Sequence, residues 1–499
     1  MFRTVLLLSS LLVLFLGGVA VAQIDEPALP DGATHEEIVQ ALENQIHFLN
    51  EVRRRGLAVF STPFNTFDGL GDGPFDPAEL DTRAFGQRPT LQGNGLFLRV
   101  NGLDAQSCNE CHTIVSNRTT PPTLGFGGVG GAVQNAIIMP TLIDVADSAD
   151  DRVNFVPGHD PSLPLVFDGE ADYNGRFANP PFLFGGGGVE LLGKEMTLDL
   201  QALLDVAQSS PAGTVVSLDT HGVNFGHITS LGGGDVDLSE IEGIGFTPEV
   251  NEERTPEEVL VVRPFGRKGE NFSMRDFDRG AMQFHFGMQP VEVVGEGNDV
   301  DGDGVEDEVT VGEMTALHVF DVTNPRPFVQ ELSNQAQQGF NRFQMIGCNE
   351  CHMPVLETES RFLPLAHPEV ADDPLANVYA FIDLVEVGFE PAPGGGVYVP
   401  LFADLKRHNM GPGLQEDFEG AEIPNSDFTT ARLWGIADTA PYIHDGRAST
   451  LFQAIAAHGG EAQTARDAFL GLSAQQQGRV IAFLRSLRVP EAPNQDLLP

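Results

Sequence analysis

The stretch Gln106-Ser-Cys-Asn-Glu-Cys-His112 shares its core with Gly347-Cys-Asn-Glu-Cys-His-Met353, more than two hundred residues later. These two Cys-x-x-Cys-His units contain all four cysteines of the 499-residue chain. The spacing is typical of covalent haem c attachment, in which both cysteines form thioethers and the next histidine ligates the iron. The sequence therefore predicts two covalently bound haem c groups, with Cys108, Cys111, Cys348 and Cys351 as attachment points and His112 and His352 as proximal iron ligands.

Other uses of the four cysteines fit the pattern less well. Two disulfides would be common in an exported chain, but they do not require a histidine directly after each pair. A zinc site also leaves that histidine unexplained twice, and zinc ligands usually lie closer together along the chain. A thioredoxin-like redox pair needs no such histidine and favours a βαβ setting.

Residues 1–22 have the pattern of a secretory signal peptide. One early arginine precedes a long apolar run, and the segment closes on Ala20-Val21-Ala22. An uncleaved anchor is the alternative, but the flank after Gln23 is acidic rather than basic. No later stretch is apolar enough over a sufficient length to cross a bilayer. We therefore expect a soluble, exported protein, located in the periplasm or its equivalent, with no membrane span after cleavage.

The formal net charge of −43 is extreme for a chain of this length. Such a surface repels nucleic acid and anionic lipid, which argues against both as partners. Solubility in a salty or calcium-bearing medium is the simpler explanation of the charge. Electrostatic steering of a basic protein partner is the alternative.

The sequence predicts a mainly α protein with two cytochrome c-like haem domains, long loops and a small β-containing insertion. The domains are expected at residues 23–297 and 298–499, and the insertion lies at about 213–265. Gln338-Gly-Phe-Asn-Arg-Phe343 is similar to the helix that leads into a haem-binding loop, as is the shorter Gln92–Phe97 stretch. The closing segment SAQQQGRVIAFLRSLRVP predicts a helix with a capping box, and glycine-rich 183–193 predicts a loop close to a flat ligand or another backbone.

Asp299-Val-Asp-Gly-Asp-Gly304 places three carboxylates on alternate positions, with glycine at the sharp turn. This is how an EF-hand-type calcium loop opens. Threonine stands at the twelfth position, where a glutamate is expected, so Glu308 or, in a longer loop, Glu313 would close the site. We therefore predict a calcium-type loop over 299–313, with Asp299, Asp301 and Asp303 as ligands; a solvated acidic turn is the alternative.

The chain resembles the bacterial di-haem cytochrome c peroxidases and their MauG-type relatives, and most closely the branch labelled di-haem oxidoreductase, putative peroxidase. The resemblance is clearest over 331–489, through Asp404-Leu-Lys-Arg-His-Asn-Met-Gly-Pro-Gly-Leu414 and Ala440-Pro-Tyr-Ile-His-Asp-Gly-Arg447. It is weaker in the N-terminal half, where Asn179-Pro-Pro-Phe-Leu-Phe-Gly185 contributes. The resemblance implies that one haem relays electrons from an external redox protein while the other reacts with peroxide.

The distal ligands would decide which haem reacts, because a haem with two strong protein ligands does not readily bind peroxide. The resemblance places a ligand fourteen residues after the histidine of the Pro-Tyr-x-His-Asp-Gly motif, and counting from His444 gives His458 rather than methionine. A His352/His458 haem would have a lower potential than a His/Met haem, which favours it as the relay. A histidine that only caps its helix is the alternative.

The first haem has several candidate distal ligands. Met288 matches a methionine of the resembled branch, and His285 is its near rival on a stripe that also fits simple core packing. An open site is a further alternative, and Met139, Met196 and His227 are weaker candidates. Glu190 is the candidate acid or base for moving a proton between peroxide oxygens; its alternative is a solvated loop carboxylate.

Two features depart from the resembled family. The only tryptophan, Trp434, lies in the C-terminal half at a position where those peroxidases have arginine, and the N-terminal half lacks their interhaem tryptophan. Arg432 and Arg447 are nearby candidates for pairing with haem propionates.

These features predict a di-haem peroxidase-like oxidoreductase. It would reduce hydrogen peroxide or a related small-molecule oxidant with electrons from an external donor such as a small cytochrome. The alternatives are an electron-transfer cytochrome without turnover, and a MauG-like oxidation of an organic or protein substrate.

Overall fold

The computed structural model describes residues 34–43, 46–65, 67–70, 107–112, 137–141, 174–180, 183–300, 302–416, 422–491 and 493–497. The predicted signal peptide, the Gln92–Phe97 stretch and Asp301 lie outside these ranges. No helix in the described part of the chain is long and apolar enough to cross a membrane.

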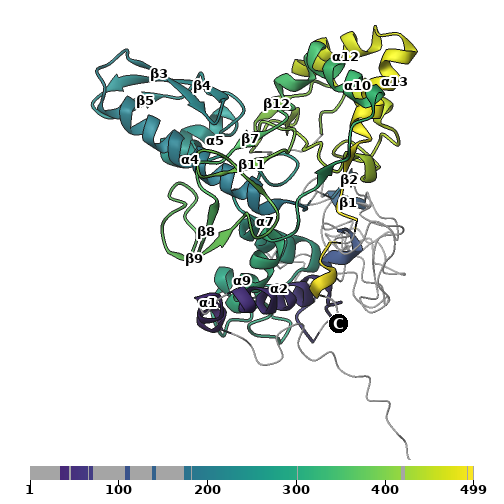
Figure 1. The fold of residues 1–499 in the computed structure, drawn as a ribbon. Coiled ribbons are helices and arrows are strands. Elements are labelled where there is room, and N and C mark those ends of the chain that lie inside the picture. The colour runs from purple at the N-terminus through teal and green to yellow at the C-terminus, as the bar shows by residue number, and fades with distance from the viewer. Residues whose placement is uncertain are drawn as a thin grey trace, which may run out of the picture.

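Three helices form a layer at one end of the molecule, at the bottom of Figure 1. They are α1 (His35–Glu43), α2 (Ile46–Ser61) and α9 (Val311–Val322). Gly56 on α2 lies against the backbone of Ala316 on α9, where a Cβ atom would overlap the carbonyl oxygen. The missing side chain therefore lets the two helices approach closely.

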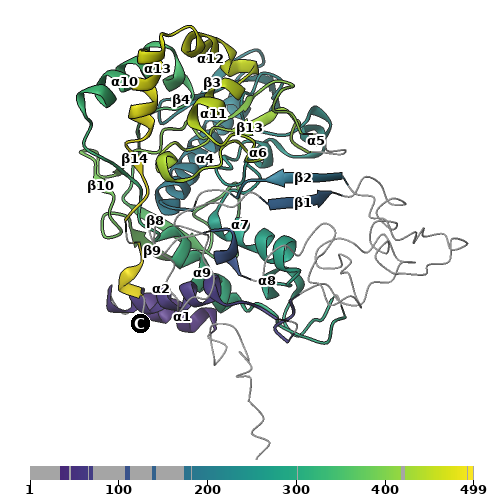
Figure 2. The ribbon, with the colours of Figure 1, turned by 90° about the vertical axis from the view of Figure 1, so that its right-hand side faces the viewer.

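The C-terminal end of the chain returns to this layer. Arg53 on α2 donates hydrogen bonds to the carboxylate of Asp496 and the side-chain oxygen of Asn494, each at 3.1 Å. The short helix η8 (Gln495–Leu497) packs beside α2, where the C-terminus is marked in Figures 1 and 2. These contacts join α2 to the last described segment of the chain.

Helix α4 (Gly186–Ser209) runs from the centre of the molecule toward an inserted three-stranded sheet. The sheet comprises β3 (Val215–Thr220), β4 (Val223–Gly232) and β5 (Asp235–Asp237), all antiparallel, and lies within the region where short strands were predicted. The loop predicted at 183–193 is wrong, because the glycines open this helix instead. Gly187 lies against the carbonyl of Val322, which agrees with the predicted approach of another backbone.

The predicted mainly α class is wrong, because the described strands form six small sheets dispersed between the helices. Most of these strands are two to six residues long and pair within connecting segments, so they leave no long alternating pattern in the sequence. Four of the sheets are pairs of strands: β1 (Ile137–Thr141) with β2 (Asn174–Ala178), β6 (Phe328–Val329) with β14 (Leu487–Arg488), β8 (Phe362–Ala366) with β9 (Val378–Asp383), and β12 (Arg407–Asn409) with β13 (Asp427–Thr429). In the second three-stranded sheet, β11 (Val397–Val399) lies between β10 (Glu390–Pro391) and β7 (Leu356–Glu357).

The second Cys-x-x-Cys-His unit is built on a helical group at the opposite end of the molecule (Figures 1 and 2). Ser333 caps the helix that leads into the motif, and Ser473 with Gln476 forms the predicted capping box of the closing helix. The elements of this group are α10 (Asn334–Met345), η5 (Cys348–Glu350), η6 (Ile436–Asp438), α11 (Leu451–Ala457), η7 (Gly460–Ala462), α12 (Gln463–Leu470) and α13 (Ala474–Leu484).

The remaining described helices are short and surround the first Cys-x-x-Cys-His unit or the inserted sheet. They are η2 (Cys108–Glu110), α5 (Pro248–Glu253), α6 (Pro256–Val259), α7 (Met274–Ala281), the π-helical turn η4 (Met282–Phe286) and α8 (Val291–Val294).

Two hydrophobic cores are present among the described residues. The smaller one lies in the C-terminal helical group and contains Phe343, Phe469 and Phe483. The larger one joins α2, α4, α7 and α9 with the strands β3, β4, β7, β8, β9 and β11, so it contains residues from both sides of the predicted boundary at 297/298. The division into two haem domains stays a prediction.

The close crossing of α10 and α13 gives a stability test. A Cβ at Gly339 would overlap the carbonyl oxygen of Arg479, whereas Gly478 on the facing helix has nothing within 4 Å of its Cβ position. Gly339→Ala should lower the free energy of unfolding by about 1–3 kcal/mol, because the helices must separate. Gly478→Ala should leave it unchanged or raise it by up to about 1 kcal/mol. Thermal unfolding of both holoproteins measures this; equal effects would contradict the crossing.

Candidate haem sites

The second Cys-x-x-Cys-His unit follows directly from the end of α10. Gly347 adopts a left-handed conformation with φ of 87°, which turns the chain from α10 into the short helix η5. The backbone N–H of His352 then donates to the carbonyl of Cys348 at 3.0 Å. This compact turn places both cysteines and the histidine on one small segment at the cavity described below.

The His352 ring is held in one orientation by a backbone hydrogen bond. Its Nδ1 lies 3.1 Å from the carbonyl oxygen of Phe402, which can only accept, so Nδ1 carries the hydrogen. Burial of the ring, together with the nearby His458, lowers the pKa of His352 to about 4. The imidazole is therefore neutral at pH 7, with the lone pair on Nε2 that a metal ligand needs.

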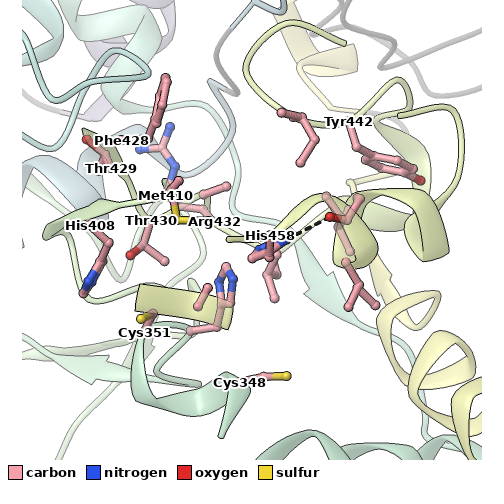
Figure 3. A pocket seen from close by; sticks show the side chains of 18 of the residues that line it. Cys348, Cys351, His408, Met410, Phe428, Thr429, Thr430, Arg432, Tyr442 and His458 are labelled. Atoms are coloured by element: carbon pink, nitrogen blue, oxygen red, sulfur yellow. Dashed lines mark hydrogen bonds between the residues drawn. The ribbon is translucent and has the colours of Figure 1, made fainter. Parts of the chain in front are cut away.

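His458 follows the last residue of α11, at the end of the helix predicted to stop at Gly459-Gly460. Its Nδ1 donates to the carbonyl of Ala454 at 2.8 Å, the dashed line in Figure 3. Burial lowers the pKa of His458, so this ring is also neutral and its Nε2 also carries a lone pair.

The rings of His352 and His458 have centroids 6.4 Å apart. Because bonds from a metal to imidazole nitrogen are about 2.0–2.1 Å long, two imidazoles on opposite sides of one ion have ring centres about 6 Å apart. The two histidines are thus spaced as a pair of axial ligands would be. This spacing fits a haem iron between them.

The two histidines line a cavity of about 380 Å³ (Figure 3). This volume lies within the roughly 300–1,000 Å³ typical of small-molecule and cofactor sites. Met410 also lines the cavity, and sequence reasoning missed it as a rival sulfur ligand. Arg432 lines it too, and burial lowers the pKa of its guanidinium to about 10, which still leaves it charged at pH 7. A cationic group here suits an anionic substituent of a bound cofactor.

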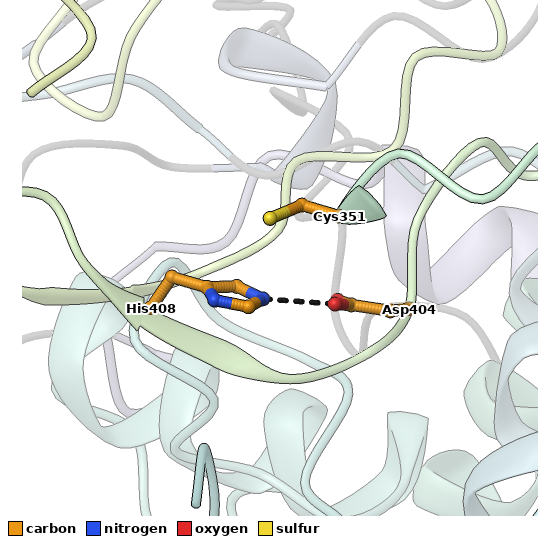
Figure 4. Close-up of side chains that lie close together, drawn as sticks. All are labelled: Cys351, Asp404 and His408. Atoms are coloured by element: carbon orange, nitrogen blue, oxygen red, sulfur yellow. Dashed lines mark hydrogen bonds and ion pairs between the residues drawn. The ribbon is translucent and has the colours of Figure 1, made fainter. Parts of the chain in front are cut away.

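Beside Cys351, His408 is hydrogen-bonded to Asp404, as Figure 4 shows, and also to Glu461. His408 Nε2 donates to Asp404 at 2.8 Å, and its Nδ1 donates to Glu461 at 2.7 Å. Burial works against the charged ring, but the interactions with Asp404 and with Cys351 outweigh burial and raise the pKa of His408 to about 11. With both nitrogens donating, His408 is unsuited to ligate a metal.

The cavity is connected to the N-terminal half of the chain through two contacts. Asn179 donates from its side chain to the carbonyls of Pro441 and Ile443, at 2.8 and 3.1 Å. Trp434 lines the cavity, is 2 % exposed, and lies so close to Gly185 that a Cβ there would be 2.6 Å from the indole. The tryptophan therefore joins the cavity wall to the beginning of α4.

The first Cys-x-x-Cys-His unit repeats the local turn of the second. The N–H groups of Cys111 and His112 both point to the carbonyl of Cys108, at 3.2 and 2.8 Å. The His112 ring lies 6.5 Å from Phe60 on α2 and 6.4 Å from Phe277 on α7, between ring centroids. No disulfide joins any two of the four cysteines, and no group of metal-ligating side chains in the described ranges combines cysteines of both units. This arrangement argues against the zinc and disulfide alternatives.

Two buried carboxyl groups lie close to Cys108. Asp278 on α7 and Asp321 on α9 are 4 % and 1 % exposed and face each other. Burial raises the pKa of Asp321 to about 8, and burial with the charge of Asp321 raises that of Asp278. The pair therefore retains a proton at neutral pH, a feature that local sequence does not reveal.

The candidate distal ligands of the first haem are dispersed. Met288 is fully buried after the left-handed Gly287, and His285 lies in the preceding π-helical turn. Met196 is buried in α4, and His227 lies on β4 of the inserted sheet. Met139 is in β1, but its side chain is outside the described part. The choice among them stays a prediction.

Glu190 is neither exposed nor in a loop. It lies in α4 with 0 % exposure, and its carboxylate is 2.7 Å from Lys194 Nζ and 3.1 Å from His318 Nε2. It also accepts a hydrogen bond from the backbone N–H of Met274 at 2.9 Å. Burial opposes ionisation, but Lys194 and His318 outweigh it and hold the pKa of Glu190 below its ordinary value. The solvated-carboxylate alternative is therefore wrong.

In the predicted calcium loop, acidic side chains accept hydrogen bonds from backbone N–H groups. The Asp299 carboxylate accepts from the N–H groups of Gly302 and Asp303, at 2.7 and 3.1 Å. Glu308 is buried and accepts from the N–H of Gln289, directly after Met288. Glu313 caps α9 through Thr310. Glu308 thus connects the loop to the residue that follows Met288, a candidate haem ligand. Glu313 is instead used in the N-terminal cap of α9.

Comparison with known proteins agrees with the C-terminal motifs. Residues 393–487 match the sequence model of the family described as "Di-haem oxidoreductase, putative peroxidase". The predicted resemblance is confirmed. Over 170 residues, the chain is 28% identical to the cytochrome-c peroxidase IdrP1 of Denitromonas iodatirespirans, covering 32% of this chain and 42% of that relative. This C-terminal part of the chain is thus similar to di-haem, peroxidase-like oxidoreductases, and the match spans less than half of the curated relative.

Solved structures give weaker matches. Kuenenia stuttgartiensis hydrazine synthase under 20 bar xenon aligns with a TM-score of 0.26 and 15% identity, over 62% of this chain and 89% of that chain. A MauG-like protein associated with microbial copper homeostasis gives 0.19 and 18%, over 38% and 58%. TM-scores this low carry no argument about fold or function.

The histidine pair gives a spectroscopic prediction. His458→Met should replace a nitrogen ligand by sulfur and raise the potential of one haem by on the order of 100 mV, within the roughly 0.8 V range that axial ligands cover. Met410→Leu, in the same cavity, should change neither haem. Redox titration with ferric optical spectra measures both variants. Unchanged spectra in His458→Met, or a shift only in Met410→Leu, would show that His458 is not the ligand.

The acidic loop gives a metal-binding prediction. Asp299→Asn should weaken calcium binding at least tenfold, because a carboxylate ligand is lost. Glu306→Gln removes a charge from the same loop at a position that does not ligate in such loops, so it should bind as the wild type does. Isothermal titration with calcium chloride measures both. The loop would be a plain acidic turn if the wild type took up no calcium or if the two variants behaved alike.

Proposed function

We propose that the protein is an exported di-haem c oxidoreductase that reduces hydrogen peroxide with electrons from an external redox protein. In this reaction, peroxide with two electrons and two protons gives two water molecules. The observation that carries the proposal is the 6.4 Å spacing of two partly buried, neutral histidines, one of them in a Cys-x-x-Cys-His motif. The family match over 393–487, which includes His458, supports it.

The C-terminal site is the proposed electron relay. Haem, when bound, would supply an iron that changes oxidation state. His352 and His458 would hold it from both sides, with Cys348 and Cys351 as the attachment points. If both histidines bound the iron, no position would remain for peroxide at this site. We therefore assign peroxide reduction to the first haem, held by Cys108, Cys111 and His112.

Proton handling is assigned to the buried group around Glu190. His318 is 0 % exposed, and its Nε2 contacts Glu190 while its Nδ1 has no hydrogen-bond partner among the described residues. Glu190, hydrogen-bonded to His318, is the proposed acid or base of the first haem site. Lys194 holds Glu190 ionised and is itself anchored to the carbonyl of Pro364.

An exported location and a soluble redox donor follow from the sequence pattern and the family resemblance. The net charge of −43 favours a donor with a basic docking surface, because opposite charges steer association. A small basic cytochrome has the properties that this surface requires.

The role of Glu190 can be separated from its structural contacts. Glu190→Gln should lower peroxide turnover by about 10²–10⁴-fold, the usual contribution of a positioned acid or base. Glu369→Gln is the matched control, because Glu369 also faces Lys194, at 3.5 Å, and lies near His318, but the hydrogen bond of His318 goes to Glu190. Steady-state peroxide consumption with a reduced small cytochrome measures turnover, and ferric spectra verify that both haems are intact. Equal activity of the two variants would assign Glu190 to folding alone.

The histidine pair also suits the alternative of an electron-transfer cytochrome, provided that the first haem has two protein ligands as well. Electron paramagnetic resonance of the half-reduced protein separates the two functions. A high-spin ferric component that is converted by added peroxide supports the enzyme. Two wholly low-spin haems that are inert to peroxide would support the carrier and overturn the proposed function.

A further inference from the structure

A further candidate metal site lies at the β3–β4 turn of the inserted sheet, beside the segment that follows the second haem motif. Asp199 on α4, His221 at the β3–β4 turn and Glu359 after β7 each offer one ligand atom, and these atoms all lie within 4.8 Å of one another. Three segments far apart in sequence thus bring an imidazole and two carboxylates together.

The His221 side chain is buried and directed into this group. It is 4 % exposed, and its Nε2 lies 3.6 Å from Glu195 and 3.8 Å from Asp199. These separations are too long for hydrogen bonds, and Nε2 has no hydrogen-bond partner in the described structure. Ligand atoms about 2.0–2.2 Å from one ion lie roughly 3–4 Å from each other, which matches the spacing.

The other His221 nitrogen is arranged as in metal-binding histidines. Nδ1 donates to the carbonyl of Glu357 at 2.7 Å, so Nε2 is the nitrogen that can bind a metal. The carboxylate ligand is also oriented, because Thr220 donates to Asp199 at 2.5 Å. Glu195 accepts from the N–H groups of Glu359 and Ser360, both at 2.8 Å, and so fixes the third segment.

The backbone of the β3–β4 turn favours a residue other than histidine at position 221. His221 and Gly222 connect β3 to β4 with φ values of 49° and 78°, a two-residue turn in which both residues are left-handed. Asparagine followed by glycine is the preferred pair for such a turn. A histidine there is less favourable for the backbone, which points to a role for its ring.

We propose that Asp199, His221 and Glu359 bind one divalent transition-metal ion of the zinc class. Imidazole and carboxylate together are typical zinc ligands, whereas calcium and magnesium sites prefer oxygen alone. Asp199 is 41% exposed, so the ion can enter from solvent. The ion would fasten the inserted sheet to the segment that follows the second haem motif, since Gly222 also lies close to Met353. The proposal does not depend on peroxide chemistry.

Zinc binding to the haem-loaded protein tests the site. Chelator-treated protein, saturated with calcium, is titrated with zinc chloride by calorimetry. The wild type should bind one zinc ion that His221→Asn binds at least tenfold more weakly. Because asparagine suits the turn, this variant should fold as well as or better than the wild type, and thermal unfolding verifies it.

A second pair of variants separates the site from the general acidity of the surface. Asp199→Asn should also weaken zinc binding at least tenfold. Asp205→Asn removes the same charge from an exposed position of the same helix and should not weaken it. Wild-type protein that binds no zinc would overturn the proposal, as would equal binding in His221→Asn, which would identify adventitious zinc only.

Discussion

The 6.4 Å separation of two partly buried imidazoles is the constraint on which the C-terminal half depends. His352 and His458 come from segments about a hundred residues apart. Each donates its Nδ1 hydrogen to a backbone carbonyl, so each has Nε2 available to bind a metal. Burial disfavours the charged form of both rings, so neither repels a cation. The crossing of α10 with α13 and the end of α11 therefore hold two neutral imidazoles in fixed positions.

The N-terminal half uses buried charge instead. Glu190, Lys194 and His318 form a fully buried group at the centre of the larger core, and Asp278 and Asp321 form a second one beside the first cysteine motif. Buried ionisable groups are costly unless they are paired, so their concentration around one cofactor motif is more consistent with proton chemistry than with stability. Trp434 and Asn179 join this half to the C-terminal cavity.

The sequence predicted those features of the structure that depend on residues close together in the chain. The cysteine motifs, the capped helices α10 and α13 and the position of His458 at a helix end are all encoded within a few residues of each other. The class of the fold was not predictable in this way, because the small sheets arise from strands that pair across connecting loops. Gly186–Gly188 open a helix because α9 and Phe389 approach too closely for side chains. The partners of Glu190, the presence of Met410 in the cavity and the group around His221 likewise depend on contacts between distant segments.

The account depends most directly on covalent attachment of two haems to the paired cysteines. Intact mass measurement under denaturing conditions, on protein produced in a host that matures cytochromes c, tests this attachment. The account predicts a polypeptide whose mass is increased by two haem groups that acid and organic solvent do not extract. A bare polypeptide, or haem that separates freely from it, would contradict the account.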